Sequence, residues 1–565
     1  MRMSTALVLG LAVLAACGPR PRDEDDDGPG LADADPGCTN VCSPDLHAVV
    51  DCHGNVTTPC AGTDACDAST LTCKDACIAA FANGRSVGCD YYATSMDVAT
   101  TGHCFAVFVA NTWTAPVHLD VKYQNAALPV AQFTRLPVGS GPGLTYAAYD
   151  PVAGVPPGEV AVLFLGGQSG SAPLCPFPSA VPGAGLSGTG ISSSFQITTD
   201  VPVVAYQINP YGGGSAAVTA ASLLLPTSVW DVNYVAVNVS PAGIGGVPSL
   251  NIIAREDDTI ATLTPVAAVS GSGGIPSGAA GQPLTIMLAK GQQAQISQSA
   301  ELTGSTITSN KPVGFMAGQP CMNMPSNVSF CDHGEQMIPP VRALGSRYIG
   351  VMYRPRVPAE TSTFWRVVGA VDGTVLTYSS AVGGPLTLDH GQSVTFQTGT
   401  PFVVNSQDNE HPFMLFTYMT GSDFNGSTGS GYGDPDFVIS VPPEQYLQQY
   451  VFFADPTYPE TNLVVVRGRG SDAQFHEVML DCAGALTGWT AINADFEFTR
   501  TDLQRGNFVD QGMCSTGRHE IKSDAPFGLW VWGWGTPETS SFTENVSYGY
   551  PGGMNVSPIN NVVLE

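Results

Sequence analysis

Three polar residues near the middle of the chain are of the types that metal binding and proton transfer require. Asp332, His333 and Glu335 lie just after Cys331. Carboxylate and imidazole groups can ligate a metal ion or act as a general acid and base. The interpretation that we favour is structural: these side chains fix a loop by hydrogen bonds to the backbone. A metal-dependent hydrolase is the alternative.

Other catalytic motifs are weak or absent. The G-x-S-x-G spacing of serine hydrolases occurs once, at residues 84–88, but this short spacing alone does not define a hydrolase, and the G-x-x-x-x-G-K pattern of phosphate-binding loops is absent. His476 and Glu477 lack the second histidine that the helix of a zinc protease needs. We therefore predict a protein that is not an enzyme and that uses no cofactor.

Two groups of residues have the chemistry of a binding surface. Trp530, Trp532 and Trp534 alternate along the chain, so a strand places their three indoles on one face. Such a row can stack on a glycan or bind a protein, although packing in the core of the last unit is the interpretation that we favour. Arg354 and Arg356, expected to be exposed, form a second candidate, with a solvated loop as the alternative.

The elements that carry these residues are predicted to be strands. Gly contributes 64 and Pro 44 of the 565 residues, and charged residues make up only 12%. Long helices need Ala, Leu, Glu and Lys at exposed positions, so this composition favours strands and turns in an all-β protein. With 21 basic and 48 acidic residues the net charge is −27, which excludes nucleic acid partners.

A pattern about one hundred residues long recurs along the chain and divides the strands into units. Its first anchor is a proline that follows a polar turn and leads into an apolar strand, at Pro202, Pro312, Pro412 and Pro526. Its second anchor consists of Pro226, Pro339, Pro442 and Pro551, the first three followed by Tyr234, Tyr348 and Tyr450. Within residues 78–565 we predict tandem β-sandwich-like repeats, with units at about 89–220, 221–335, 336–437 and 438–565. A β-propeller-like arrangement is the alternative.

The cysteines predict a disulfide-rich module before these repeats. Residues 38–77 contain Cys38, Cys42, Cys52, Cys60, Cys66 and Cys73 with almost no large apolar side chains. Such a segment needs covalent links, although the pairing stays open; a zinc site with His47 and His53 is the alternative. Further along, we predict two bridges, Cys321 with Cys331 and Cys482 with Cys514, because each closes a loop with little regular structure.

The N-terminus has the pattern of an exported, anchored protein. Residues 1–16 read as a signal peptide, and Leu14 to Cys17 resembles the lipobox of bacterial lipoproteins, which implies lipidation of Cys17. An ordinary cleaved signal peptide is the alternative. Residues 17–37 form an acidic linker; part of it matches the first half of a calcium loop, but Ala34 stands where the bidentate glutamate belongs. We expect an outer membrane lipoprotein of a bacterial cell envelope, facing the surface.

Several sequence segments of the central repeat resemble those of a known protein family. The matching residues are Glu301–Ile307, Asn310–Val313, Gly318, Cys321, Cys331–His333, Glu335–Gln336 and Pro339–Pro340. They resemble the N-terminal domain of the IgG Fc-binding protein family, with further similarity between about residues 100 and 540. Gly334 departs from the pattern, where an apolar residue is expected. The resemblance implies an extracellular binding or adhesive module, with the IgG ligand belonging to the animal member.

Together these features predict a cell-surface lipoprotein with a non-catalytic binding or adhesion role toward a protein or glycan. Several similar units would raise avidity without a strong individual site. A structural scaffold of the envelope is the alternative, and a metal-dependent hydrolase is favoured least.

Overall fold

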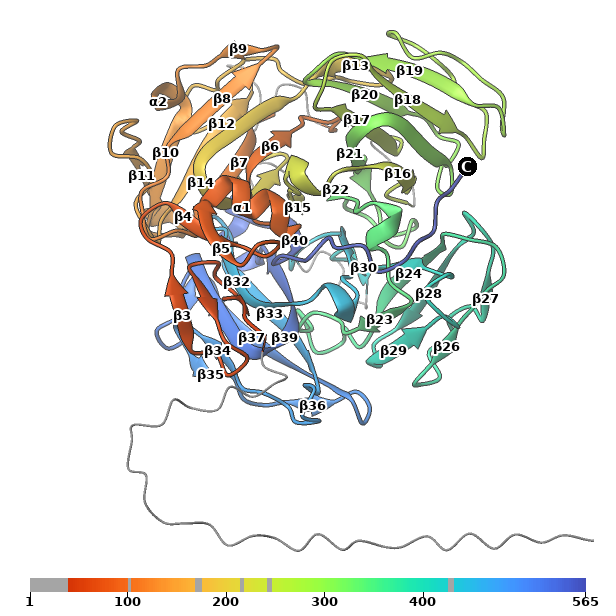
Figure 1. Ribbon diagram of the computed structural model, residues 1–565. Coiled ribbons are helices and arrows are strands. Elements are labelled where there is room, and N and C mark those ends of the chain that lie inside the picture. Colours follow the sequence, from red (N-terminus) through yellow and green to blue (C-terminus); the bar gives the residue numbers. More distant parts are fainter. Residues whose placement is uncertain (1–38, 100–102, 168–174, 214–217, 241–245, 425–430) are drawn as a thin grey trace, which may run out of the picture.

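The computed structural model describes residues 39–99, 103–167, 175–213, 218–240, 246–424 and 431–565. The expected signal peptide at 1–16, the lipidation site Cys17 and the acidic linker at 17–37 lie outside the described residues. Nearly all regular structure in the described part is strand, which confirms the all-β prediction (Figure 1). Among the described helices, none has both the length and the apolar character needed to cross a membrane.

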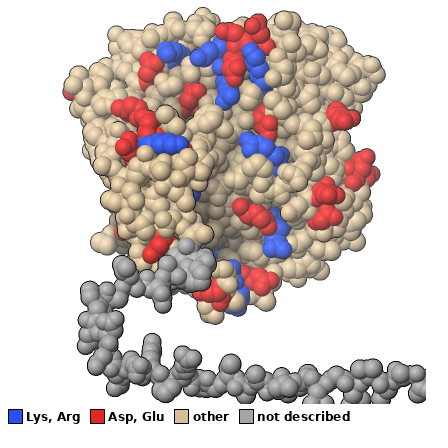
Figure 2. All heavy atoms as spheres, in the orientation of Figure 1, with Lys and Arg blue, Asp and Glu red and all other residues tan. Residues whose placement is uncertain are grey.

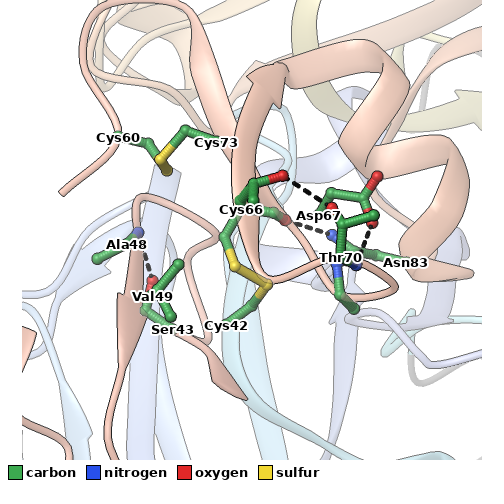
Figure 3. Close-up of a disulfide and its surroundings, with 12 residues drawn as sticks. Cys42, Ser43, Ala48, Val49, Cys60, Cys66, Asp67, Thr70, Cys73 and Asn83 are labelled. Atoms are coloured by element: carbon green, nitrogen blue, oxygen red, sulfur yellow. Dashed lines mark hydrogen bonds between the residues drawn. A yellow bond between two sulfur atoms is a disulfide. The ribbon is translucent and has the colours of Figure 1, made fainter. Parts of the chain in front are cut away.

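A small module of short strands and disulfides comes first. Its strands are β1 (Val41–Cys42), β2 (Ala48–Val50), β3 (Val56–Pro59), β4 (Asp64–Asp67) and β5 (Thr72–Asp75). Disulfides join Cys42 to Cys66 and Cys60 to Cys73 (Figure 3). The zinc alternative is wrong for these cysteines, because a sulfur in a disulfide is not a thiolate ligand. His47 instead packs on Trp113, with 4.2 Å between the ring centroids.

The first two of four larger units follow this module. The first contains α1 (Ala76–Asn83), β6 (Gly88–Ala93), β7 (Phe105–Asn111), β8 (Leu119–Tyr123), β9 (Ala126–Ala127), α2 (Val130–Phe133), β10 (Thr134–Val138), β11 (Thr145–Ala148), β12 (Val160–Gly166), β14 (Phe195–Ile208) and β15 (Ala221–Leu223). The second contains β16 (Asp231–Val235), β17 (Ser249–Ala254), β18 (Thr259–Thr264), β19 (Leu284–Leu288), β20 (Gln292–Ser297), β21 (Thr306–Met322) and β22 (Asp332–Met337). β13 (Gly190–Ser193) precedes β14 in the chain but pairs with β20, so it couples the two units.

The last two units follow the same plan. The third contains β23 (Arg347–Gly350), β24 (Thr363–Gly369), β25 (Thr374–Val375), β26 (Thr377–Tyr378), β27 (Thr387–Leu388), β28 (Ser393–Thr398), β29 (Phe402–Asn405), β30 (Phe413–Met419) and β31 (Asp436–Ile439). The fourth contains β32 (Leu447–Ala454), β33 (Glu460–Gly468), β34 (Val478–Leu480), β35 (Gly484–Ala485), β36 (Thr490–Ala491), β37 (Phe496–Arg505), β38 (Val509–Asp510), β39 (Gly517–Trp534) and β40 (Ser547–Pro551). The four units surround a common centre (Figure 1).

The innermost strand of each unit lines this centre. β15, β22 and β40 each pair with the long strand of their own unit, and β31 pairs with β30 of the third unit. Each also contacts its two neighbours, in the order β15, β22, β31, β40 and back to β15. The repeats therefore close into a ring, which is the geometry of the propeller-like alternative. The first, second and fourth units each keep two groups of strands on one long strand, whereas the third unit divides these groups between β29 and β30.

The first anchor prolines lie at bends of these long strands. Pro202, Pro312 and Pro526 are inside β14, β21 and β39, so the predicted polar turn before them is wrong; only Pro412 follows a break, between β29 and β30. Around each of the three the ladder changes partners, and residues 200–202, 310–312 and 524–526 are left unpaired. A proline there costs no ladder hydrogen bond.

A buried tyrosine satisfies the backbone at each bend. The Tyr234 hydroxyl donates to the carbonyl of Val313, 2.7 Å away, and accepts the N–H of Asp231 at 3.1 Å. Tyr91 donates in the same way to the residue after Pro202 at 2.7 Å, and Tyr450 to the residue after Pro526. We call these hydroxyl contacts of Tyr91, Tyr234 and Tyr450 the tyrosine latch, because each one holds the backbone of a long strand at its bend.

The structure also corrects the second anchor. A short 3₁₀ turn follows three of the inner strands, as η3 (Thr227–Val229), η4 (Val341–Ala343) and η6 (Pro443–Gln445), and the residues that precede the turns are Pro226, Pro340 and Pro442. Pro340 rather than Pro339 is therefore the equivalent position. Pro551 ends β40 and belongs to a different position of the repeat.

The segment after β40 closes the ring. Met554 makes two hydrogen bonds with the start of the first unit: the Ser86 N–H donates to its carbonyl at 2.9 Å, and its own N–H donates to the Ser86 hydroxyl at 3.0 Å. The segment then crosses to the third and second units, where Ile559 donates to the Arg342 carbonyl and Asn233 binds Leu564. Figure 1 shows this path in dark blue.

Candidate functional site

The structure places Asp332, His333 and Glu335 on β22 at the centre of the ring, all fully buried. Asp332 accepts the backbone N–H of Thr219 at 3.1 Å and that of Ser547 at 2.9 Å. The favoured interpretation, hydrogen bonding to the backbone, therefore describes Asp332 well. The expected loop is wrong, because the residue lies on a strand and ties together two other units.

The electrostatics of this centre favour uncharged side chains. Burial raises the pKa of Asp332, Glu335, Asp434 and Asp436 well above the ordinary range of a carboxyl group. Burial also lowers the pKa of His333 to about 3. The Glu335 carboxyl accepts the side-chain amide of Gln207 at 2.7 Å and lies 3.6 Å from the His333 ring.

Among the described residues, this centre does not bring three metal-ligating side chains together. Within the described residues, ligand atoms from three or more such side chains come within 4.8 Å of one another only at Asp481, Cys482 and His519. There the Cys482 sulfur is bonded to Cys514, as predicted, and Asp481 is bound to His519 at 3.0 Å. The second predicted bridge, Cys321 with Cys331, is also formed and precedes β22.

The three tryptophans are core residues. Trp530, Trp532 and Trp534 are 7%, 1% and 0% exposed, so the predicted surface platform is wrong and the favoured core packing is right. β39 pairs with β33 and β40 along its two edges, and its tryptophans pack against the rings of Tyr353 and Tyr446. A Cβ on Gly549 would lie 2.7 Å from the Trp532 ring, which shows how closely the neighbouring strand packs.

Neither arginine is an exposed cation: Arg354 packs against one of these tryptophans and Arg356 against Tyr353. The Arg354 guanidinium lies 4.8 Å from the Trp534 ring centroid and pairs with Asp502 at 2.8 Å. Arg356, whose side chain is 4% exposed, pairs with Glu360 at 2.6 Å. The expectation of a free cationic surface is therefore wrong, since carboxylates of the third and fourth units neutralise both side chains. Arg354 and Trp534, two candidates from the sequence that are 180 positions apart, are thus in contact.

A site that the sequence analysis missed lies on helix α1. Asp75 caps the helix by accepting the N–H groups of Cys77 and Ile78, and Gly84 ends it in the left-handed conformation. Ala76, Ala79 and Ala80 are buried against the body. An eight-residue helix is marginal alone, but the disulfide between Cys77 and Cys89 fixes it to β6.

The other face of α1 is apolar and open to solvent. Ile78 is 60% and Phe81 57% exposed. Beside them lies a cavity of about 390 Å³ whose wall includes the Cys77–Cys89 disulfide, Pro226 and Asp90. This volume is within the range of about 300–1,000 Å³ that is usual for ligand sites. Charged side chains are sparse over much of the molecule, as Figure 2 shows for one face. The spacing of the buried alanines at 76, 79 and 80 is the sequence signal for the helix.

The fold and this cavity define a class: an all-β ring of four repeated units with an apolar recess on its surface. The model of the family described as "IgGFc binding protein" matches residues 220–533, more than half of the chain, and the chain belongs to that family. Over 242 residues it is 24% identical to the IgGFc-binding protein of Homo sapiens. That alignment covers 42% of this chain and 4% of the human protein, so the chain spans a small part of its relative.

Proposed function

We propose that this protein binds a protein partner without catalysis, through the apolar face of α1 and the cavity beside it. The observation that carries the proposal is the exposure of Ile78 and Phe81 on a helix fixed at both ends. Large apolar side chains exposed next to a recess are typical of protein-binding surfaces. A rigid helix also loses little conformational entropy when the partner binds.

Membership of the family supports a binding role. The human relative is named for binding the Fc part of IgG, and a protein ligand agrees with an exposed aliphatic and aromatic pair better than a glycan does. Glycans usually stack on flat aromatic faces, and the tryptophan row that the sequence offered for that role is buried.

The cellular setting is part of the proposal. A lipid on Cys17 and the acidic segment at 17–37 would hold the ring away from a membrane surface. In this setting the protein is an outer membrane lipoprotein with an adhesive role. Mass spectrometry of the N-terminal peptide tests it, since a diacylglyceryl adduct on Cys17 is expected and an unmodified N-terminus beyond residue 17 would contradict the anchor.

An array of extracellular proteins, including human Fc, and of glycans tests the binding role with the whole chain, disulfides formed. We expect saturable binding to a protein ligand and at least tenfold weaker binding of the variant Phe81→Ser. The matched control is Val152→Ser, because Val152 is 86% exposed but lies away from the cavity. Both variants should keep the melting temperature of the parent protein, since neither position is in the core.

Three outcomes separate the alternatives. Binding that survives Phe81→Ser moves the site elsewhere. Binding to glycans alone contradicts the protein ligand. A folded sample that binds nothing favours the envelope scaffold, which cross-linking in cells would then show as contacts with other envelope proteins.

A further inference from the structure

The wall of the α1 cavity carries one charge, and it is negative. The wall residues other than Asp90 are apolar or neutral: Cys77, Ile78, Phe81, Cys89, Pro226 and Thr227, with two further small residues. No Lys, Arg or His is among them. A ligand in this cavity would therefore contact a mostly apolar wall and a single carboxylate, that of Asp90.

The partners of Asp90 leave its charge uncompensated. One carboxylate oxygen accepts the side-chain amide of Gln196 at 2.9 Å, and the other accepts the hydroxyl of Thr227 at 2.9 Å. Both donors are neutral. They hold the carboxylate in place but supply no positive charge.

The basic residue that the structure places beside this wall is engaged elsewhere. Arg255 donates to the backbone carbonyl of Thr227 at 2.7 Å and to Glu256 at 3.2 Å. Glu256 therefore neutralises Arg255, and neither side chain is part of the cavity wall. The chain as a whole has a net charge of −27, so its long-range field also attracts cations.

We propose that the partner segment recognised by the α1 cavity presents an apolar side chain next to a lysine or arginine, the apolar group packing on Phe81 and the cation pairing with Asp90. This inference rests on the proposed function, because it names the chemistry of the partner at the same site. The charge complementarity of the cavity selects a basic peptide over an acidic one.

Three capped peptides that differ in one residue test the inference: Gly-Gly-Phe-Lys-Gly-Gly, the same sequence with Gln, and the same with Glu. Their binding to the whole chain is measured by saturation-transfer NMR at low and at high salt. We expect the Lys peptide to bind at least fivefold better than the Gln peptide and the Glu peptide to bind least. The preference should shrink at high salt, because ions screen the pair.

Asp90→Asn is the diagnostic variant. Its side-chain oxygen can still accept from Gln196 and its amide can donate to the Thr227 hydroxyl, so the wall keeps its shape while losing its charge. We expect this variant to bind the three peptides equally. The matched control is Glu477→Gln, which changes the net charge equally at an exposed position of the fourth unit and should keep the preference for Lys.

The outcomes distinguish this inference from the function on which it rests. Equal binding of all three peptides to the parent chain, lost in Phe81→Ser, overturns the charge selection and leaves the docking site standing. Absence of binding for every peptide and every array protein overturns both. A Lys preference that persists in Asp90→Asn assigns the attraction to the overall field and overturns the role of Asp90.

Discussion

At the scale of single residues, the interior of the ring is unusual for its carboxyl groups. Asp332, Glu335, Asp434, Asp436 and Asp455 are buried, and burial raises the pKa of each. A buried carboxyl group is tolerated when it is protonated or hydrogen-bonded. The polar centre therefore works as a set of hydrogen-bonding groups between units, and the sequence could identify the residues without revealing their burial.

Asp455 allows a quantitative test of this view. Burial raises its pKa to about 6, while an unfolded aspartate titrates near 4. Below pH 4 both states are protonated; between pH 4 and 6 only the unfolded state ionises, so rising pH favours unfolding by up to about 3 kcal/mol. Asp455→Asn removes this dependence while its oxygen still accepts from Thr457. The parent protein should therefore lose up to about 3 kcal/mol of stability between pH 4 and pH 7 that Asp455→Asn does not lose, so the variant should become more stable relative to the parent as the pH rises.

Urea unfolding at closely spaced pH values measures this difference. The matched control is Asp120→Asn, which removes a carboxyl group at an exposed position, and the two variants are compared over the same pH range. If the free energies of unfolding of Asp455→Asn and of the parent changed in parallel with pH, ionisation of Asp455 would not destabilise the folded protein, and the prediction would be wrong.

At the scale of elements, the repeat could be recognised in the sequence, but the strand pairing at its prolines could not. The period, the all-β composition and two of the disulfides followed from proline, tyrosine and cysteine positions. The sequence at Pro202 predicted a turn. A polar pair followed by proline is compatible with a turn and equally with an unpaired bend at which one long strand changes its hydrogen-bonded neighbours. Only tertiary pairing decides between them. For the same reason Arg354 looked exposed, since its partner Asp502 is far away in the sequence.

The tyrosine latch predicts a specific loss of stability. In Tyr234→Phe the carbonyl of Val313 and the N–H of Asp231 lose their side-chain partner at the bend of β21. The free energy of unfolding should fall by about 1–3 kcal/mol, which is the usual cost of leaving a buried polar group unsatisfied. The matched control is Tyr378→Phe, because the buried Tyr378 hydroxyl has no hydrogen-bond partner within the part of the chain that the structure describes, and its removal should be neutral or stabilising. Equal effects of the two variants in denaturant titrations would mean that the latch contributes nothing.

At the scale of the whole molecule, the four units share their interior. One apolar core contains residues of the first, third and fourth units, and a second core joins the second unit to the third. Units that share cores cannot unfold one at a time without exposing the interior of a neighbour. The ring is therefore expected to behave as one cooperative body, unlike a row of independent sandwiches, and its closure carries part of the stability of every unit.

The closing contact between the last and first units is the place to test this cooperativity. Deletion of residues 553–565 removes the hydrogen bonds between Met554 and Ser86, whereas deletion of 558–565 keeps them and removes the contacts of Ile559 and Leu564. By calorimetry we expect one transition for the parent protein, and a larger fall in its midpoint for the longer deletion than for the shorter one. The fall should affect the whole transition, since opening the ring weakens all four units together. Separate transitions in the parent, or a longer deletion that lowers only one of them, would mean that the units fold independently and that the ring is held by contacts of little energetic weight.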